Sequence, residues 1–149
     1  MLDYKDLDLW KASRKLVNSI YRITKPFPSY ESFGLTLQLR RCAVSIPSNI
    51  AEGIGRNHTK DTVQFLFVAR GSLFELETQI YIASDQDYIM NDDLSCILDE
   101  IETCKKLLNG FIGYHQHKLK QRIVKMVCSS FHYLCRLNTI HQTLNTKIP

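Results

Sequence analysis

The residue types that most often carry catalysis or hold metals are present, but their spacing fits no catalytic site. A di-iron site in a helical bundle needs Glu-x-x-His on two helices, and the residue three positions before each of the five histidines is not acidic. The sequence also lacks H-E-x-x-H, G-x-S-x-G and a phosphate-binding Walker loop. We therefore expect no enzymatic activity, no bound metal and no cofactor.

One group of soft metal ligands lies near the C-terminus. Cys128, His132 and Cys135 would share one face if this segment were helical, because they are spaced by four and three residues. Three such ligands can recruit zinc, but a fourth would have to come from elsewhere in the chain. Short basic segments often contain incidental cysteine and histidine, so we do not predict a metal site here.

Two sets of basic residues are candidates for contact with nucleic acid. Arg40 and Arg41 lie beside the apolar stripe of the predicted second helix, and Arg41 is expected to point outward. Arg56, His58 and Lys60 cluster at the turn before the third helix, where donors could meet phosphate groups. Our candidate residues are Arg40, Arg41, Arg56 and Lys60. Ordinary solvated surface charge is the alternative interpretation.

The basic candidate residues are expected to lie on or between helices. Apolar side chains recur every three or four positions in four segments, which is the pattern of amphipathic helices. The segments are residues 9–23, 35–50, 66–83 and 94–111. No hairpin turn and no alternating run of β-branched residues indicates a strand. Four helices with short links predict an all-α, antiparallel up-down four-helix bundle over residues 1–120.

The predicted second helix contains Pro47 within its apolar stripe. Proline has no N–H to donate to the carbonyl four residues earlier, and its ring crowds that turn, so we expect a kink. Ser29 is a plausible N-terminal cap, and Gly53 and Gly55 suit a left-handed helix exit. The alternative is two shorter helices that meet at Ile46.

The third helix has an apolar arc wider than one bundle seam requires. Either this helix is central in the bundle, or another subunit buries one of its flanks. We predict a subunit contact that also includes two residues of the first helix. The candidate interface residues are Val17, Tyr21, Phe65, Phe67, Phe74 and Tyr81.

Arg70 and Glu77 fall near the middle of this apolar arc. An isolated buried ion costs several kcal/mol, so a charge placed there must be paired. The two residues are about 10 Å apart along the helix axis, so each is expected to pair across helices. Arg40 is one candidate partner for Glu77. A polar site inside the bundle is one interpretation; we favour a buried polar network that fixes helix register.

Two long sequence blocks carry a family resemblance. Residues 39–56 (LRRCAVSIPSNIAEGIGR) join two basic residues to a helical proline and end on two glycines, and residues 65–79 read FLFVARGSLFELETQ. With the opening YKDLDLW at residues 4–10, they resemble the four-helix-bundle protein family, also called the 23S rRNA intervening-sequence protein family. The resemblance covers residues 4–114.

Members of this family are small all-α proteins, and some are encoded within insertions in 23S rRNA genes. A related branch, the accessory variability protein of diversity-generating retroelements, forms a pentameric barrel that binds nucleic acid and a reverse transcriptase. The resemblance therefore implies a non-enzymatic homo-oligomeric adaptor, with a pentamer as one expected form. It implies RNA or DNA as a partner, and a reverse transcriptase or another protein as a second one. The charged residues at matching positions are Arg40, Arg41, Glu52, Arg56, Arg70, Glu75 and Glu77.

The C-terminal part of the chain departs from the family pattern. The formal net charge is +4, yet residues 1–114 hold 13 basic and 15 acidic side chains, and residues 115–149 hold six basic and no acidic ones. We expect residues 121–149 to form a basic extension, either as a loose fifth helix or without fixed structure. A basic segment suits a polyanionic partner.

Cysteine usage and the distribution of apolar residues indicate where the protein is located. Five cysteines without a C-x-x-C pair argue against a disulfide framework and favour a reduced, cytoplasmic location. The N-terminal residues do not resemble a signal peptide, and no uncharged stretch approaches the length of a membrane span. Two functions stay open: a nucleic-acid-associated oligomeric adaptor, and a protein-interaction scaffold with no nucleic-acid role.

Overall fold

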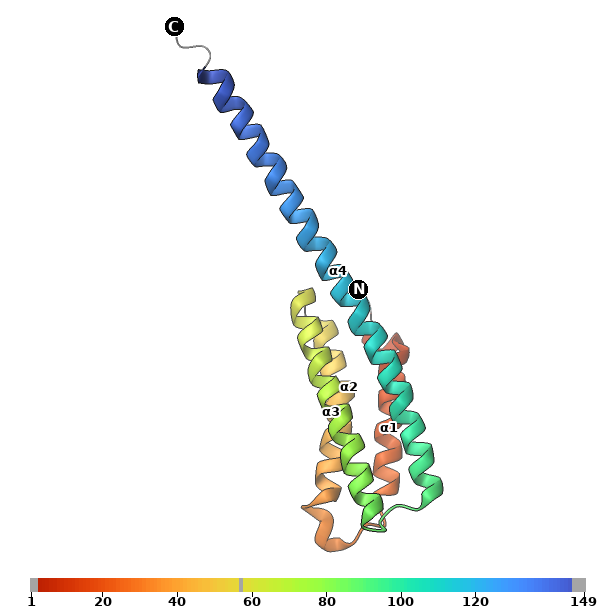
Figure 1. Ribbon diagram of the computed structural model, residues 1–149. Helices are drawn as coiled ribbons and strands as arrows, with labels where there is room; N and C mark the ends of the chain where they lie inside the picture. The colour runs from red at the N-terminus through yellow and green to blue at the C-terminus, as the bar shows by residue number, and fades with distance from the viewer. Residues whose placement is uncertain (1–2, 57, 146–149) are drawn as a thin grey trace. The chain divides into compact units, whose positions relative to one another are not determined.

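Every regular element in the described residues is helical (Figure 1). The computed structural model describes residues 3–56 and 58–145, with side chains as far as residue 127. The predicted all-α class is confirmed, and the described residues contain no strand. The elements are two short 3-10 helices, η1 (Tyr4–Asp6) and η2 (Ser29–Ser32), and four α-helices, α1 (Asp8–Ile23), α2 (Leu35–Gly55), α3 (Thr59–Asp85) and α4 (Asn91–Asn145).

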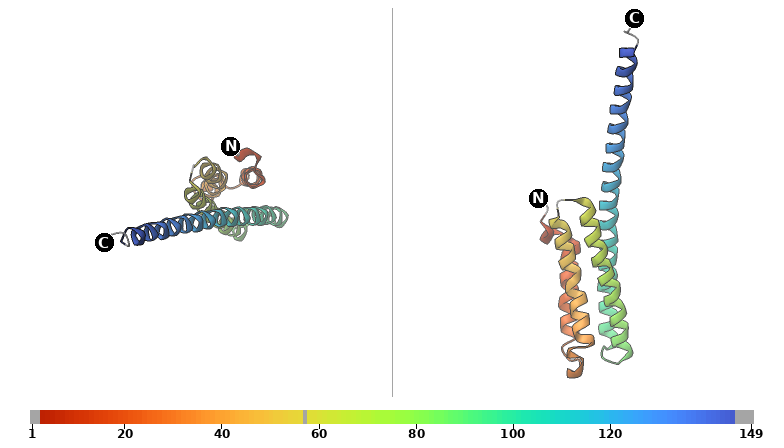
Figure 2. Two further views of the ribbon diagram at one scale, coloured as in Figure 1. Left: turned by 90° about the horizontal axis from the view of Figure 1, so that it is seen from above. Right: turned by 90° about the vertical axis from the view of Figure 1, so that its left-hand side faces the viewer.

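Four helical segments pack around one hydrophobic core. α1, α2, α3 and the first part of α4 lie side by side, and the chain reverses direction at each connection (Figure 1 and Figure 2). Their predicted apolar stripes are the faces that meet in the core. Burying each large aliphatic side chain stabilises the fold by about 1.5–3 kcal/mol. The largest fully buried side chains are Leu16, Ile20, Leu39, Ile46, Ile50, Leu66, Leu73, Leu76, Ile80, Ile97, Ile101 and Leu108.

The second helix continues through its proline. α2 is one α-helix with Pro47 inside it, so the alternative of two shorter helices is wrong. Side chains add hydrogen bonds on this turn, where the proline lacks an N–H. Ser48 Oγ donates to the Val44 carbonyl at 2.8 Å, and Asn49 Nδ2 donates to the Ser45 carbonyl at 2.8 Å. The bend at Pro47 stays a prediction.

The start of α2 differs from the expectation that Ser29 caps it. Ser29 begins the short helix η2, and the backbone N–H of Leu35 donates instead to the Glu31 carboxylate at 2.7 Å. A Cβ atom at Gly34 would collide with that carboxylate. Glu31 therefore caps α2 from four residues away, and Gly34 leaves the space that its side chain needs.

The end of α2 also has a different cause from the predicted one. α2 ends at Gly55, but no described glycine has a positive φ, so the left-handed exit is wrong. A Cβ atom at Gly53 would lie 3.0 Å from Phe65 Cβ and 3.2 Å from the Thr62 carbonyl oxygen. Gly53 thus allows close approach between α2 and α3.

The chain divides into two compact units, residues 1–115 and residues 116–149. The sequence predicts the end of the bundle domain at residue 120, five residues after the end of the first unit. Instead of a separate fifth helix, the second unit continues α4 without a break as far as Asn145. Within the described residues, no helix combines the length and the apolar character needed to cross a membrane.

Candidate nucleic-acid and subunit interfaces

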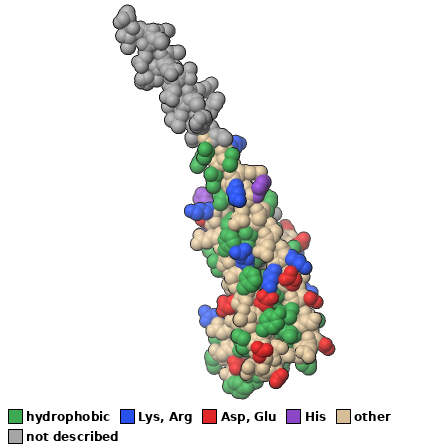
Figure 3. All heavy atoms as spheres, viewed as in Figure 1, with side chains coloured by type: hydrophobic (Ala, Val, Ile, Leu, Met, Phe, Trp, Pro, Cys, Tyr) green, Lys and Arg blue, Asp and Glu red, His purple; other side chains and the backbone are tan. Residues whose placement is uncertain are grey.

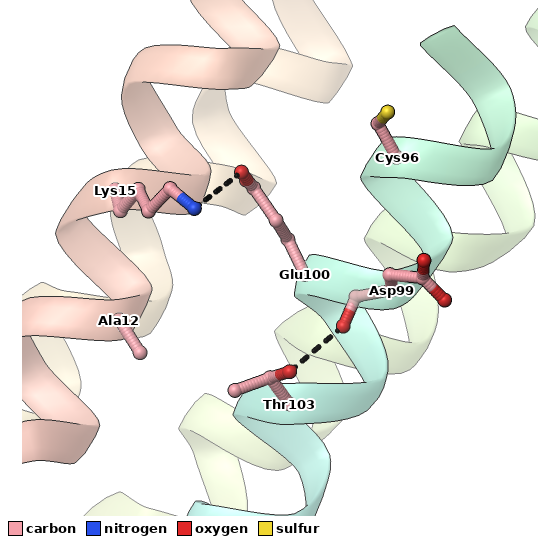
Figure 4. A pocket seen from close by; sticks show the side chains of 6 residues that line it. All are labelled: Ala12, Lys15, Cys96, Asp99, Glu100 and Thr103. Atoms are coloured by element: carbon pink, nitrogen blue, oxygen red, sulfur yellow. Dashed lines mark hydrogen bonds and ion pairs between the residues drawn. The ribbon is translucent and has the colours of Figure 1, made fainter. Parts of the chain in front are cut away.

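One pocket gathers several reactive side chains between α1 and α4 (Figure 4). It has a volume of about 350 Å³, and Lys15 Nζ pairs with Glu100 Oε1 across it at 3.2 Å. Cys96 is exposed at its edge, but no histidine lines it, so a cysteine nucleophile would lack an adjacent imidazole base. The lining residues are Ala12, Lys15, Cys96, Asp99, Glu100 and Thr103.

Metal ligands do not converge in the part of the chain whose side chains are described. No group of three or more His, Cys, Asp or Glu side chains there could hold a metal ion. The side chains of Cys128, His132 and Cys135 lie outside the described residues.

Arg40 is held by contacts within the bundle. Its Nε donates to Thr24 Oγ1 at 2.8 Å, and its guanidinium carbon lies 4.9 Å from the centre of the Tyr21 ring. Thr24 is buried and donates in turn to the Ile20 carbonyl at 2.8 Å. Arg40 therefore joins α2 to α1, and its predicted pairing with Glu77 is wrong.

The other three nucleic-acid candidates lie in two places. Arg56 pairs with Glu52 at 2.5 Å and lies 5.0 Å from the Phe65 ring centre, while Lys60 is exposed in the first turn of α3. Arg41 is exposed on α2, about 22 Å from Arg56 along the helix axis. A half-exposed ion pair such as Arg56–Glu52 contributes about 0–1 kcal/mol, so phosphate could replace Glu52.

Arg70 and Glu77 take part in different contacts. Glu77 pairs across helices, as predicted, but its partner is Lys105 of α4, with an N–O distance of 2.5 Å. The side chains of Glu77 and Lys105 are 23% and 17% exposed. Arg70 is half-buried and lies 4.6 Å from the Phe67 ring centre. The structure does not place Arg70 and Glu77 in one buried network.

The seam between α2 and α3 holds an unreactive thiol. Burial, and after it the nearby Glu75 carboxylate, raise the pKa of Cys42 to about 12. Gln79 Nε2 lies 3.5 Å from Cys42 Sγ and 3.1 Å from Glu75 Oε1. At neutral pH Cys42 is therefore a protonated packing residue.

Three aromatic side chains form a line along the outer surface of α3. Phe67, Phe74 and Tyr81 are 37%, 49% and 48% exposed and recur every seven residues, which is about two helical turns. We call these three residues the aromatic stripe. Arg70 lies over the Phe67 ring, and Lys105 Nζ lies 5.1 Å from the Phe74 ring centre. Hydrophobic side chains are visible between charged ones on the face shown in Figure 3.

The other three predicted interface residues lie elsewhere. Phe65 is half-buried at the junction of α2 and α3, beneath Arg56. Val17 is half-buried in a groove between α1 and α2, and Tyr21 is exposed on α1 beneath Arg40. The six residues therefore do not form one continuous surface, and only the aromatic stripe follows a single helix face.

A known family matches the sequence over most of the bundle. Residues 5–110 match the family model described as 23S rRNA-intervening sequence protein. The chain belongs to this family. The match confirms the resemblance predicted over residues 4–114, and it ends inside α4. Among curated proteins, no match to the chain is found.

A solved structure shares the fold of this member of the 23S rRNA-intervening sequence protein family. It is the crystal structure of a protein of unknown function from the S23 ribosomal protein family of Bacteroides thetaiotaomicron. The two chains are 22% identical with a TM-score of 0.65, and the similarity covers 70% of this chain and 97% of that chain. At this identity, the similarity shows the fold alone.

Sequence reasoning missed two features of this family member. Lys105, the partner of Glu77, lies one helical turn after the buried Ile101, on the border of the fourth apolar stripe. A groove of about 300 Å³ between α1 and α2 is lined by Trp10 and Pro47, among others. The spacing of Trp10, Arg14 and Val17 by four and three residues is the signal that could have revealed it.

Proposed function

We propose that this protein is a non-enzymatic, self-associating adaptor of the 23S rRNA-intervening sequence protein type, acting in the cytoplasm in association with RNA or DNA. The proposed self-association rests on one observation, the aromatic stripe on α3. Seven-residue spacing is the pattern by which helices pack against one another with a small crossing angle. The free thiols of Cys42, Cys96 and Cys104 are consistent with a reducing compartment.

The aromatic stripe would supply part of the free energy of a subunit contact. Burying the exposed remainder of Phe67, Phe74 and Tyr81 would contribute on the order of 5 kcal/mol, at about 25 cal/mol per Å². Association costs roughly 4–15 kcal/mol in lost translational and rotational freedom. The stripe alone would only balance that cost, so the adjacent exposed residues Val68 and Ile82 would also belong to the interface. We propose a closed ring, with a pentamer as the expected form.

The proposed association with nucleic acid rests on the family and on exposed cations. The family is named for sequences that interrupt 23S rRNA, and Arg41 and Lys60 are exposed on the bundle. A ring would repeat these few charges several times, so many weak phosphate contacts could act together. A reverse transcriptase or another protein is a further proposed partner.

Nucleic-acid binding by the full chain tests this proposal. The change in fluorescence anisotropy of a labelled structured RNA, and of a DNA duplex of the same sequence, would be measured over a range of salt concentrations. We expect binding at low salt whose affinity falls steeply as salt rises, because phosphate contacts release counterions. Binding that is insensitive to salt, or no binding at the lowest salt used, would contradict the proposed role.

A protein-interaction scaffold without a nucleic-acid role is the second candidate. Two observations favour it: the apolar groove between α1 and α2, and the excess of acidic over basic side chains in residues 1–114. A chain that self-associates but binds neither RNA nor DNA at low salt would support this alternative.

A further inference from the structure

Two opposite sides of the bundle carry exposed apolar side chains. The Lys15–Glu100 pair joins α1 to α4, and α2 packs between α1 and α3. Helices α1 and α2 therefore form one side of the bundle, and α3 and α4 form the opposite side. The groove between α1 and α2 opens on the first side. The aromatic stripe lies on the second, because the Phe74 ring is close to Lys105 of α4.

Helix α2 carries an apolar row with the same spacing as the aromatic stripe. Leu37, Val44 and Ala51 recur every seven residues. Leu37 and Val44 are 37% and 41% exposed, and Ala51 is half-buried. Val44 and Ala51 also line the groove. We call these three residues the α2 row. Seven-residue rows on two helices suit packing side by side.

The α2 row and the aromatic stripe lie at the same levels along the bundle. Ser45 Oγ of α2 and Ser72 Oγ of α3 are 2.9 Å apart. The two helices run in opposite directions, so Val44 is level with Phe74 to within about one residue, or about 1.5 Å. Steps of seven residues along each helix preserve the match. The residues at equal levels are Val44 with Phe74, Ala51 with Phe67, and Leu37 with Tyr81.

The charges of the bundle favour contact between its two opposite sides. Residues 8–55, from the start of α1 to the end of α2, hold seven basic and three acidic side chains. Residues 59–110, on α3 and α4, hold four basic and ten acidic ones. Arg14 lines the groove and is exposed. Stripe against stripe would bring two acidic sides together, whereas stripe against groove brings opposite charges together.

We propose that the aromatic stripe of one copy binds the α2 row and the adjoining groove of the next copy, in a head-to-tail contact. This inference rests on the proposed self-association and names the surface that receives the stripe. In a ring whose axis runs along the helices, neighbouring copies lie at one level, so the matched residues of the two rows meet. Large aromatic side chains on one face then pack against the smaller Leu37, Val44 and Ala51 on the other.

A head-to-tail contact has two consequences. It joins two different surfaces, so it closes into a ring when the rotation between copies permits, whereas stripe against stripe would give a two-fold dimer. The receiving face also buries apolar area of its own, which adds to the contribution of the stripe and helps to offset the cost of association.

Two variants that each lose one surface test this pairing. Phe74→Glu places a carboxylate in the stripe and leaves the groove intact. Val44→Glu places one in the α2 row and leaves the stripe intact. The two changes alter the net charge equally, and the replaced side chains are 49% and 41% exposed, so neither should unfold the bundle. Circular dichroism of each full-length variant checks its helical content.

Mixing the two variants should restore one contact. Each variant alone should be monomeric in sedimentation velocity at micromolar concentration, where the wild type is oligomeric. An equimolar mixture should form a 1:1 dimer and nothing larger, because the intact stripe of Val44→Glu binds the intact groove of Phe74→Glu. Native mass spectrometry identifies the mixed pair, since the variants differ in mass. The control mixture of Phe67→Glu with Phe74→Glu has no intact stripe and should stay monomeric.

The outcomes separate this inference from the proposed self-association. If the wild type is oligomeric but Val44→Glu also remains oligomeric, the α2 row does not receive the stripe. The same conclusion follows if the mixture of Val44→Glu and Phe74→Glu stays monomeric. In both cases the proposed self-association stands and this inference falls, which leaves the groove to a different protein. If the wild type is monomeric at every concentration, the proposed self-association itself fails.

Discussion

The bundle and the C-terminal unit use the same helical periodicity but distribute charge in opposite ways. In the bundle, cations are mostly engaged by the chain itself, as in the pairs Lys15–Glu100, Lys105–Glu77 and Arg56–Glu52. The described part of the C-terminal unit has basic side chains and no carboxylates. The comparison teaches that the net charge of the chain averages over two regions of different charge composition.

The two regions also differ in what holds them together. The bundle buries aliphatic side chains from four helices in one core. In the C-terminal unit, Ile123, Val124, Met126 and Val127 are all more than half exposed. The stability of the bundle should therefore be insensitive to changes in residues 116–127.

The largest expected effect is on the free energy of unfolding, and it tests this difference in packing. Leu73→Ala removes a fully buried side chain, so it should lower the free energy of unfolding by about 2–5 kcal/mol. Ile123→Ala, which changes an exposed side chain, should alter it by less than about 0.5 kcal/mol. Urea unfolding followed by circular dichroism gives both values. Equal losses would show that residues 116–127 share the cooperative core of the bundle.

The next effect compares two ion pairs within the bundle. Glu77→Gln leaves the mostly buried Lys105 without its carboxylate and should cost about 1–2 kcal/mol of unfolding free energy. Glu52→Gln, at the half-exposed pair with Arg56, should cost about 0–1 kcal/mol. The same urea titrations measure both. A larger loss for Glu52→Gln would contradict the structural role assigned to the Glu77–Lys105 pair.

Thiol reactivity gives a third, smaller contrast. Burial raises the pKa of Cys42 to about 12 and that of Cys104 to about 11, whereas Cys96 is exposed. Because the thiolate is the nucleophile, Cys96 should be alkylated at least about 100-fold faster than Cys42 at mildly alkaline pH. Peptide mapping after brief labelling resolves the three sites. Equally rapid labelling of Cys42 in the folded protein would show that the α2–α3 seam opens.

The smallest predicted effect concerns two tyrosines that join η2 to the α3–α4 turn. The hydroxyl groups of Tyr30 and Tyr88 lie 3.1 Å apart, and this hydrogen bond raises the pKa of Tyr88 from 10.0 to about 12. A raised folded-state pKa favours the protonated form, so the stabilisation is complete below pH 10 and is lost as pH rises toward 12. In an absorbance titration of tyrosinate, Tyr30→Phe should lower the pKa of Tyr88. An unchanged titration would contradict the contact.

The fold was predictable because four strong apolar stripes leave little choice of architecture. The apolar stripe of α2 continues through Pro47. Buried residues precede and follow the proline, and the helix does not end there. The cap of α2 was not predictable in the same way. Ser29 has high capping propensity, but the longer Glu31 side chain reaches the Leu35 N–H, and only the path of the chain decides between them.

The contacts of the charged residues were harder to predict than their helix faces. Periodicity placed Glu77 toward a neighbouring helix, yet it could not say which one, and the structure brings Lys105 there instead of Arg40. The C-terminal unit was uncertain because its apolar stripe is weak. Without a proline or a cap after residue 111, nothing in the sequence ends α4, and the helix continues.

Sedimentation velocity of the full chain tests the central claim that the bundle assembles through the aromatic stripe. The wild type should sediment as an oligomer at micromolar concentration, and Phe74→Glu should sediment as a monomer because it places a carboxylate in the contact. Phe33→Glu is the matched control, since Phe33 is 90% exposed and lies outside the stripe, and it should behave as the wild type. A wild type that is monomeric at every concentration, or a Phe74→Glu variant that remains oligomeric, would contradict the account.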